Sequence, residues 1–257
     1  MRQIFLACSL IVGLAGMLHA EGSSTETDPK IDPEALALVT SVATHLAAQP
    51  ALQVNWFVSF DEVLDGREKI NHFRSGQSVI ERGTGYYAYL EQENGQREFF
   101  FDGETVSVVM VEKDAYVSAP FDGSFTELAE AIYRERGEAL PIWQVLVPTV
   151  ADELLENVTS AAYLGQRQIA GRDLHHIALS SYESDLQLWI EQAGEDAPEL
   201  VMLIGTDPYT QGWPQYRAYF TDWNFAPDLG EGFFVYAPDE DATRMTWPLQ
   251  DVAEGGN

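Results

Sequence analysis

The C-terminal third of the chain, residues 185–238, consists of short runs in which long apolar side chains recur at every second position. Leu186, Leu188 and Ile190 have this spacing in the first run, and residues 216–220 repeat it. The runs are rich in aromatic and β-branched residues and end at Gly, Pro or Asp, which is typical of antiparallel strands joined by turns. Because alternate side chains of a strand point to the same side, one face of this sheet must be buried. The segment therefore predicts that a sheet is the frame of the protein.

The same alternation appears earlier in the chain. It is clearest at 52–60, and further strands are expected through 69–119 and 161–180. Within these regions, 69–75 and 77–82 are predicted as two weaker strands, and 232–238 is predicted as the last strand of the C-terminal meander. The pattern amounts to about ten or eleven antiparallel strands.

In three segments the sequence pattern indicates a helix rather than a strand. Asp32 and Pro33 are residue types favoured at the cap and first position of a helix, and apolar residues then recur at three- and four-residue spacing as far as Leu46. Residues 124–127 read Ser-Phe-Thr-Glu, which is the spacing of a capping box. A shorter helix is expected at 149–157.

These elements predict an α+β fold built on one large antiparallel sheet with about three helices. So few helices cannot cover both faces of the sheet, as they do in parallel α/β folds, so the sheet must curl around its own apolar face. The expected result is a strongly curved, half-open β-barrel with the helices laid across its concave side. This architecture favours an elongated apolar cavity between helices and sheet.

The first twenty residues have the features of a secretory signal peptide. Arg2 gives a positive start, residues 4–18 are largely apolar, and Ala20 offers a small residue for cleavage. A retained anchor helix is the alternative, although the apolar run is short for a membrane span. Cys8 is the only cysteine and lies within this segment, so the mature chain cannot form a disulfide.

Composition divides the chain into successive parts. Residues 1–20 are the expected signal peptide, and residues 21–31, rich in Ser, Thr and acidic side chains, are expected to be a disordered leader. Residues 32–247 carry the strand and helix patterns and are predicted to form a single half-barrel domain. Residues 248–257 are expected to be a disordered tail.

The chain is strongly acidic, with a formal net charge of -27. A field of this sign repels nucleic acid and anionic membrane surfaces, so neither is expected as a partner. In one interpretation, the acidic surface keeps the protein soluble. In the other, an acidic surface docks a basic partner.

Four runs of sequence resemble an uncharacterised family of predicted periplasmic bacterial proteins. They are 97–105 (REFFFDGET), 173–180 (DLHHIALS), 185–191 (DLQLWIE) and 214–227 (PQYRAYFTDWNFAP), and the resemblance extends over residues 31–245. The family has no established activity, and its expected shape is similar to that of the periplasmic outer-membrane lipoprotein carriers and their receptors. The resemblance implies a periplasmic location and a concave apolar face that holds acyl chains under a helical lid. It carries over no residue role.

Neighbouring His175 and His176 are the residues that most resemble metal ligands. Adjacent side chains of a strand point to opposite faces, so these two imidazoles cannot share one ion. His19, His45 and His72 are the other histidines, and His19 belongs to the signal peptide. Structural histidines and no metal site are expected.

Carboxylates are abundant enough for a pair to reach glycosidase spacing by chance. Asp61, Glu62, Asp65 and Asp102 are candidates in that sense only, and Asp65 and Asp102 each precede a Gly, where turn geometry explains them. The sequence has no Gly-x-Ser-x-Gly nucleophile elbow and no glycine-rich phosphate loop. An enzyme is therefore the third hypothesis, with no catalytic residue and no cofactor expected.

The apolar face of the sheet is the remaining candidate site. It combines alternating strand residues with Trp143, which lies in an apolar connector at 141–147. These side chains line a ligand cavity in one interpretation and are packed core in the other. The set is Trp56, Val58, Phe60, Phe99, Phe101, Val106, Val108, Met110, Trp143, Leu186, Leu188, Tyr216 and Phe220.

The leading hypothesis is a non-enzymatic periplasmic protein that binds a hydrophobic ligand, such as a lipid or the acyl part of a lipoprotein, in the half-barrel. No stable membrane span is expected after cleavage of the signal peptide. The alternative is a periplasmic sensor or adaptor that docks another envelope protein. An apolar cavity favours the first hypothesis and a broad exposed apolar patch favours the second.

Overall fold

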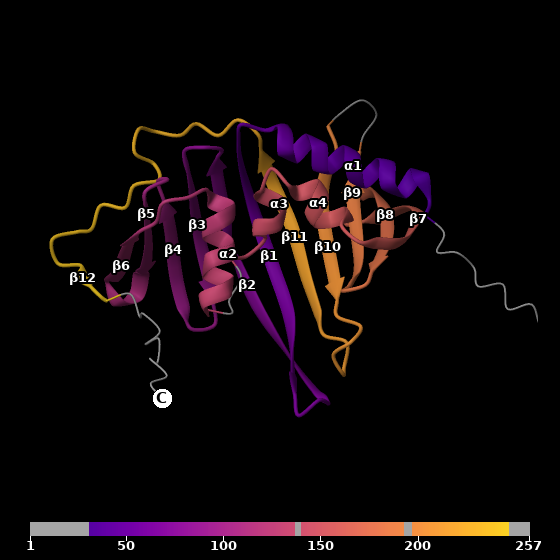
Figure 1. Cartoon of the computed structure of the whole chain (residues 1–257), viewed down its shortest axis with the longest axis horizontal. Helices are drawn as coiled ribbons and strands as arrows, with labels where there is room; N and C mark the ends of the chain where they lie inside the picture. Colours follow the sequence, from indigo (N-terminus) through magenta and orange to yellow (C-terminus); the bar gives the residue numbers. More distant parts are fainter. Residues whose placement is uncertain (1–30, 137–139, 193–196, 247–257) are drawn as a thin grey trace, which may run out of the picture.

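In the computed structural model, residues 31–136, 140–192 and 197–246 are described. They form one 12-stranded sheet in the order β12-β6-β5-β4-β3-β2-β1-β11-β10-β9-β8-β7 (Figure 1). The strand pairs are antiparallel except for the short β12, which runs parallel to β6. The predicted α+β fold with a large curved antiparallel sheet is confirmed, with 12 strands where about ten or eleven were expected.

The strands are β1 (Ala51–Leu64), β2 (Glu68–Glu81), β3 (Gly85–Gln92), β4 (Gly95–Phe101), β5 (Thr105–Met110), β6 (Ala115–Pro120), β7 (Val158–Ile169), β8 (Arg172–Ser181), β9 (Asp185–Glu191), β10 (Glu199–Thr206), β11 (Gln215–Asn224) and β12 (Thr243–Arg244). The helices are α1 (Pro33–Ala48), α2 (Phe125–Arg136), α3 (Trp143–Leu146) and α4 (Val150–Leu155), with a single 3₁₀ turn, η1 (Val111–Lys113), between β5 and β6. The expected signal peptide, almost all of the leader and the tail lie outside the described residues.

The strand β2 is continuous where the sequence predicted two strands, and Gly76 explains the difference. Gly76 faces Trp56 of β1 and Leu90 of β3 in the ladder. A Cβ atom at this position would lie 2.7 Å from the Trp56 ring and 2.0 Å from the carbonyl oxygen of Tyr89. The glycine interrupts the side-chain alternation without interrupting the strand, because the indole of Trp56 occupies the space above it.

The prediction of a strand at 232–238 is wrong. This segment has no strand and crosses the sheet as irregular chain, with the ring of Phe233 5.5 Å from that of Tyr87 and the ring of Tyr236 5.4 Å from that of Phe100. Its aromatic residues cover the face of β3 and β4 rather than extend a ladder. The chain then reaches the edge of the sheet and adds β12, which was not predicted.

The expected connector at 141–147 contains a further short helix, α3, so the described residues form four α-helices where about three were predicted. The helix predicted at 149–157 corresponds to α4. A four-residue helix leaves too little periodicity to separate it from an apolar connector.

The beginnings of the two long helices are as predicted. The Asp32 side chain accepts a hydrogen bond from the main-chain N–H of Glu34 at 2.9 Å, and Pro33 opens α1. Before α2, Ser124 and Glu127 form a reciprocal capping box, in which each side chain accepts from the other residue's main-chain N–H. The Glu127 carboxylate accepts from both the main-chain N–H and the hydroxyl of Ser124, and these two bonds lower the pKa of Glu127.

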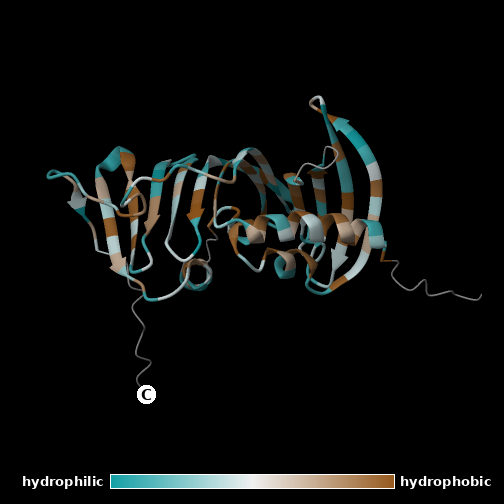
Figure 2. Cartoon of the chain, turned by 90° about the horizontal axis from the view of Figure 1, so that it is seen from above, coloured by the Kyte–Doolittle hydropathy of each residue, from teal (hydrophilic) through white to brown (hydrophobic). Residues whose placement is uncertain are grey.

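The helices and the sheet form two layers (Figure 2). Strands β7 and β8 bend around α1, and the helices lie along the concave side, as predicted. The core lies between the layers. On α1 it is formed by Ala35, Val39, Val42, Ala43 and Leu46, which repeat at helical spacing.

Candidate functional site: the concave face and the hollow beside α1

The register of the strands defines which residues share the concave face. Trp56 of β1 pairs with Phe220 of β11, and Val58 pairs with Ala218. Directly paired residues of antiparallel strands have their side chains on the same face. Tracing the ladder from strand to strand brings the predicted strand residues onto one face, namely Trp56, Val58, Phe60, Phe99, Phe101, Val106, Val108, Met110, Leu186, Leu188, Tyr216 and Phe220. Their contact with a ligand stays a prediction.

These residues fall into two groups by burial. Trp56, Val58, Phe101, Val106, Leu188 and Phe220 are buried in the core between sheet and helices. Phe60, Phe99, Val108, Met110, Leu186, Tyr216 and the helical Trp143 are only partly buried. The first group packs against neighbouring side chains, so it forms the walls of the half-barrel, and only the second group retains surface to offer to a ligand.

A small polar cluster is enclosed in this apolar core. The Trp56 indole donates from Nε1 to Ser78 Oγ at 3.0 Å, and Ser78 Oγ lies 3.3 Å from the Tyr86 hydroxyl. The Tyr86 ring in turn stacks on Phe125 of α2, with centroids 4.2 Å apart. Each buried polar atom of the cluster therefore has a partner, and the cluster joins α2 to the sheet.

A second tyrosine joins the sheet to the chain before α3. The Tyr216 hydroxyl accepts a hydrogen bond from the main-chain N–H of Ile142 at 3.4 Å. Burial raises the pKa of Tyr216 to about 12, so this hydroxyl stays neutral at physiological pH. Ile142 itself has a positive φ of 56°, an uncommon conformation for a β-branched residue, and the hydrogen bond helps to hold it there.

Arg82 fixes the C-terminal ends of α1 and α3. Its guanidinium donates from Nε to the carbonyl oxygen of Gln49 (2.8 Å), from Nη1 to that of Leu146 (2.8 Å) and from Nη2 to that of Leu46 (2.9 Å). The last carbonyls of a helix have no partner within the helix, and a cation suits the negative end of the helix dipole. Burial lowers the pKa of Arg82. Sequence reasoning missed this residue, since no local pattern predicts which carbonyls it meets.

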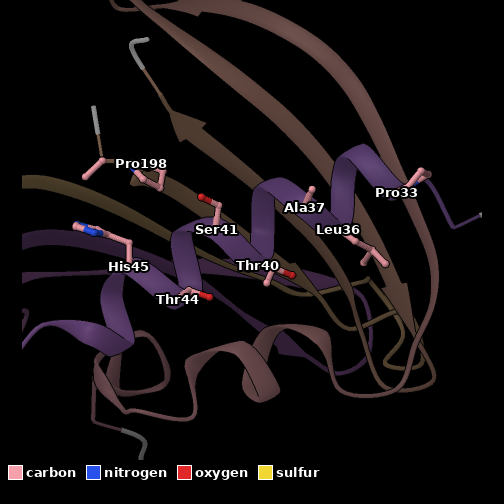
Figure 3. A pocket seen from close by; sticks show the side chains of 9 residues that line it. Pro33, Leu36, Ala37, Thr40, Ser41, Thr44, His45 and Pro198 are labelled. Atoms are coloured by element: carbon pink, nitrogen blue, oxygen red, sulfur yellow. The ribbon is translucent and has the colours of Figure 1, made fainter. Parts of the chain in front are cut away.

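The larger of two hollows described on the surface lies beside α1 (Figure 3). It has a volume of about 650 Å³ and opens to solvent. Figure 3 shows side chains from successive turns of α1, with Pro198 approaching from the connection between β9 and β10. The lining consists of Pro33, Leu36, Ala37, Thr40, Ser41, Thr44, His45, Ala197 and Pro198.

The lining of this hollow contains no Asp, Glu, Lys or Arg, although the chain has 41 acidic residues. On α1 the lining follows three- and four-residue spacing and occupies a different face from the buried stripe. The helix therefore has a core face and a second face that carries no Asp, Glu, Lys or Arg. The sequence contained this second stripe as a signal, but its partner at 197–198 is distant in sequence, and the alternation of the strands gives no indication of it.

A smaller hollow of about 150 Å³ lies where α4 meets β7, β8 and β9. Its lining includes Glu153, Glu156 and Glu183 together with serine side chains. Burial and the neighbouring carboxylate of Glu130 raise the pKa of Glu153. A polar lining of this kind does not suit an apolar ligand.

The histidines are separated in the fold. His176 stacks on Trp189, with centroids 4.2 Å apart, and lies 3.0 Å from Gln187, whereas His175 bonds to the Tyr163 hydroxyl at 2.9 Å on the other face. Their opposite orientation is as predicted. Among the described residues, no group of three or more His, Cys, Asp or Glu side chains is placed to hold a metal ion. His45 lies at the end of the hollow, edge-on to the ring of Phe225 at 4.6 Å.

Asp61, Glu62 and Asp102, three of the carboxylates singled out in the sequence, have structural partners, and Glu62 lies 2.9 Å from His72 Nε2. Asp65 lies in the turn after β1 with a positive φ of 49°. Burial alone would raise the pKa of Asp61, but hydrogen bonds from Arg217, from the main-chain N–H of Gln215 and from Asn71 outweigh it and lower the pKa to about 2. Asp102 accepts from the main-chain N–H groups of the following turn, as its position before Gly predicted.

Residues 35–247 match the model of the family described as "predicted periplasmic protein (DUF2092)". The chain belongs to this family. The resemblance drawn from the four sequence runs is thereby confirmed. No curated protein matches the chain. No helix in the described part of the chain is long and apolar enough to cross a membrane.

Several solved structures are similar to this chain at low sequence identity. LprF from Mycobacterium bovis is 14% identical with a TM-score of 0.46, covering 77% of this chain and 96% of its own. The lipoprotein LppX from Mycobacterium tuberculosis is 16% identical with a TM-score of 0.46, covering 77% and 98%. A LolA superfamily protein from Nitrosomonas europaea is 13% identical with a TM-score of 0.35, covering 79% and 97%. Similarity at this level says nothing about ligands.

Proposed function

We propose that this protein is a non-enzymatic binding protein of the periplasm that holds a hydrophobic ligand, such as a lipid or the acyl part of a lipoprotein. The observation that carries the proposal is the uncharged hollow beside α1, of about 650 Å³. Pockets for small molecules have volumes of about 300–1,000 Å³ and are mostly apolar with a few polar groups. The hydroxyls of Thr40, Ser41 and Thr44 supply such groups beside Leu36 and Pro198.

The proposal assigns α1 the role of one wall of the site. Its buried stripe attaches it to the sheet, Arg82 fixes its C-terminal end, and its uncharged face remains available to an apolar chain. The partly buried members of the predicted set do not line this hollow. They lie on the concave face of the sheet, or on α3 in the case of Trp143, and we propose them as a second apolar surface of the protein. They are Phe60, Phe99, Val108, Met110, Trp143, Leu186 and Tyr216.

Filling the hollow tests this proposal. Thr40→Trp places an indole in the hollow, whereas Ala48→Trp adds the same side chain at an exposed position of α1 outside the lining. Protein purified from the periplasm without detergent is extracted with organic solvent, and the extract is analysed by mass spectrometry. We expect a stoichiometric lipid in wild type and Ala48→Trp and its loss in Thr40→Trp. Absence of lipid from wild type, or equal lipid in all three proteins, contradicts the proposal.

A second candidate function is a sensor or adaptor that docks another envelope protein. The observation in its favour lies on the convex face, where Phe57, Phe73 and Tyr219 are exposed beside one another. The Phe57 ring is 5.7 Å from Phe73 and 6.2 Å from Tyr219. Exposed aromatic clusters are common at protein interfaces. Phe57→Ser weakens partner capture in this case and leaves lipid content unchanged.

A further inference from the structure

Two hairpin ends project together at the end of the molecule opposite α1 (Figure 1). One is the turn between β1 and β2, and the other is the connection between β10 and β11. The two ends are in contact. A Cβ atom added at Gly66 would lie 3.1 Å from Gln211 Oε1, and one added at Gly212 would lie 3.4 Å from the methyl groups of Val63. We call this pair of ends, residues 62–70 and 207–214, the hairpin tip.

The base of the hairpin tip is fixed by Asp61. Its carboxylate accepts from the main-chain N–H of Gln215 at 3.1 Å and from Arg217 Nη1 at 3.2 Å, which joins β1 to β11. Lys69 of β2 lies 3.4 Å from the same carboxylate. The two ends are therefore held as one projection.

The hairpin tip exposes large apolar side chains. Trp213 is 67% exposed and Tyr209 is 73% exposed, and on the neighbouring end Leu64 and Ile70 are 38% and 43% exposed. Isolated exposed apolar residues are ordinary, but four of them at one projecting end require an explanation.

The chain holds Trp213 outward at a conformational cost. The Asp207 carboxylate accepts from the main-chain N–H groups of Tyr209 (2.8 Å) and Thr210 (3.0 Å), and the N–H of Trp213 donates to the carbonyl of Thr210 at 2.9 Å. Trp213 adopts a positive φ of 50°, which is an outlier for a bulky residue. Strained conformations are retained where the surrounding structure enforces them, and they concentrate at functional positions.

We propose that the hairpin tip docks the protein onto the surface of a lipid bilayer. Trp and Tyr favour the interface between lipid and water, and Leu64 and Ile70 supply side chains for the acyl boundary. A thin projection that enters a bilayer end-on contacts lipid with side chains from both of its faces, so docking does not need a single apolar face. A stable protein interface buries about 800 Å² on each partner, whereas a narrow tip offers only a small contact. The proposal is independent of the ligand hollow.

The charge of the hairpin tip indicates which bilayer it contacts. Residues 62–70 contain the exposed Arg67 and Lys69 but also Glu62, Asp65 and Glu68, so the tip has no excess of positive charge. The rest of the chain is strongly acidic. Electrostatics therefore favours zwitterionic lipid over anionic lipid.

Sedimentation with vesicles tests the docking. Wild-type protein is mixed with phosphatidylcholine vesicles and with vesicles that also contain phosphatidylglycerol. The variant carries Tyr209→Ser and Trp213→Ser together, and the matched control is Tyr133→Ser, which removes a 59% exposed tyrosine from α2. We expect wild type and Tyr133→Ser to sediment with phosphatidylcholine, the double variant to bind about tenfold more weakly, and phosphatidylglycerol to weaken binding.

Fluorescence gives an independent measurement on a variant with minimal change. Bromine-labelled lipids are expected to quench the emission of bound wild type, and Trp213→Phe is expected to lose most of this quenching although the other tryptophans remain. Wild type that stays in the supernatant, equal sedimentation of wild type and the double variant, or unchanged quenching in Trp213→Phe would each overturn the proposal. A lipid that co-purifies with wild type bears on the hollow beside α1 and not on this docking.

Discussion

Replacing Arg82 with Met is expected to reduce the free energy of unfolding by about 3 kcal/mol. The substitution keeps an apolar stem of similar length but removes three hydrogen bonds, to the carbonyl oxygens of Gln49, Leu146 and Leu46. A hydrogen bond from a charged donor contributes about 1.5–3 kcal/mol. The three bonds share one guanidinium, and carbonyls at a helix end regain water when the end frays, so the loss is smaller than their sum.

The assay is urea denaturation of wild type, Arg82→Met, Arg82→Lys and the control Arg67→Met. Lysine keeps the charge but lacks the planar fork that reaches three carbonyls, so its loss should fall between wild type and Met. Arg67 is exposed at the hairpin tip, and its substitution should change stability by less than about 0.5 kcal/mol. Amide exchange near Leu46 should also accelerate in Arg82→Met, because the end of α1 is released.

A loss below about 1 kcal/mol in Arg82→Met, which is the range of an exposed charged residue, would refute this reasoning. A loss of the full size without faster exchange at the end of α1 would contradict the assignment of Arg82 to the helix ends. The test also concerns function, since α1 forms the wall of the proposed ligand site.

Two further substitutions test the sheet. Gly76→Ala should lower the free energy of unfolding, measured by urea denaturation, by about 3 kcal/mol, because the added Cβ would collide with Trp56 and the Tyr89 carbonyl. The control is Gly230→Ala, since Gly230 has open space around it. Similar stability of the two variants contradicts the steric argument. Asp61 has a pKa of about 2 in the folded chain against an ordinary 3.8, so its stabilising contribution is present above about pH 4 and is lost as the pH falls toward 2. Asp61→Asn should therefore flatten the dependence of the urea midpoint on pH between about 5 and 2. If the slope of Asp61→Asn equals that of wild type, or that of the turn variant Asp65→Asn, this prediction is contradicted.

The alternation of β1 allowed its face to be predicted because the side-chain period of a strand is two. Trp56, Val58 and their partners Phe220 and Ala218 occur on the concave face for this reason alone. The beginning of α1 was also predictable, since Asp32 and Pro33 act within a few residues of each other. Local rules therefore account for the frame of the fold and for the side of the sheet that faces the helices.

The features that were not predicted depend on distant segments. Arg82 meets carbonyls of α1 and α3, and the hollow beside α1 requires residues 197–198, so neither has a local signature. The segment 232–238 has the composition of a strand but uses its aromatic rings to cover the sheet. Burial also could not be read from alternation, because Phe101 and Phe99 share a face while only the first is buried.

The pairing of β1 with β11 sets an order of events for folding. The strands β1 to β6 and β7 to β11 each follow one another through local hairpins, but the two series join only when β1 meets β11, where Asp61 and Gln215 are 154 positions apart. A chain that emerges from an export channel with its N-terminus first exposes the free edge of β1 until its C-terminal third follows. An unpaired central strand is a template for aggregation. The proposed periplasmic location therefore requires that this unpaired edge be protected during export, and truncation before β11 should yield insoluble chains.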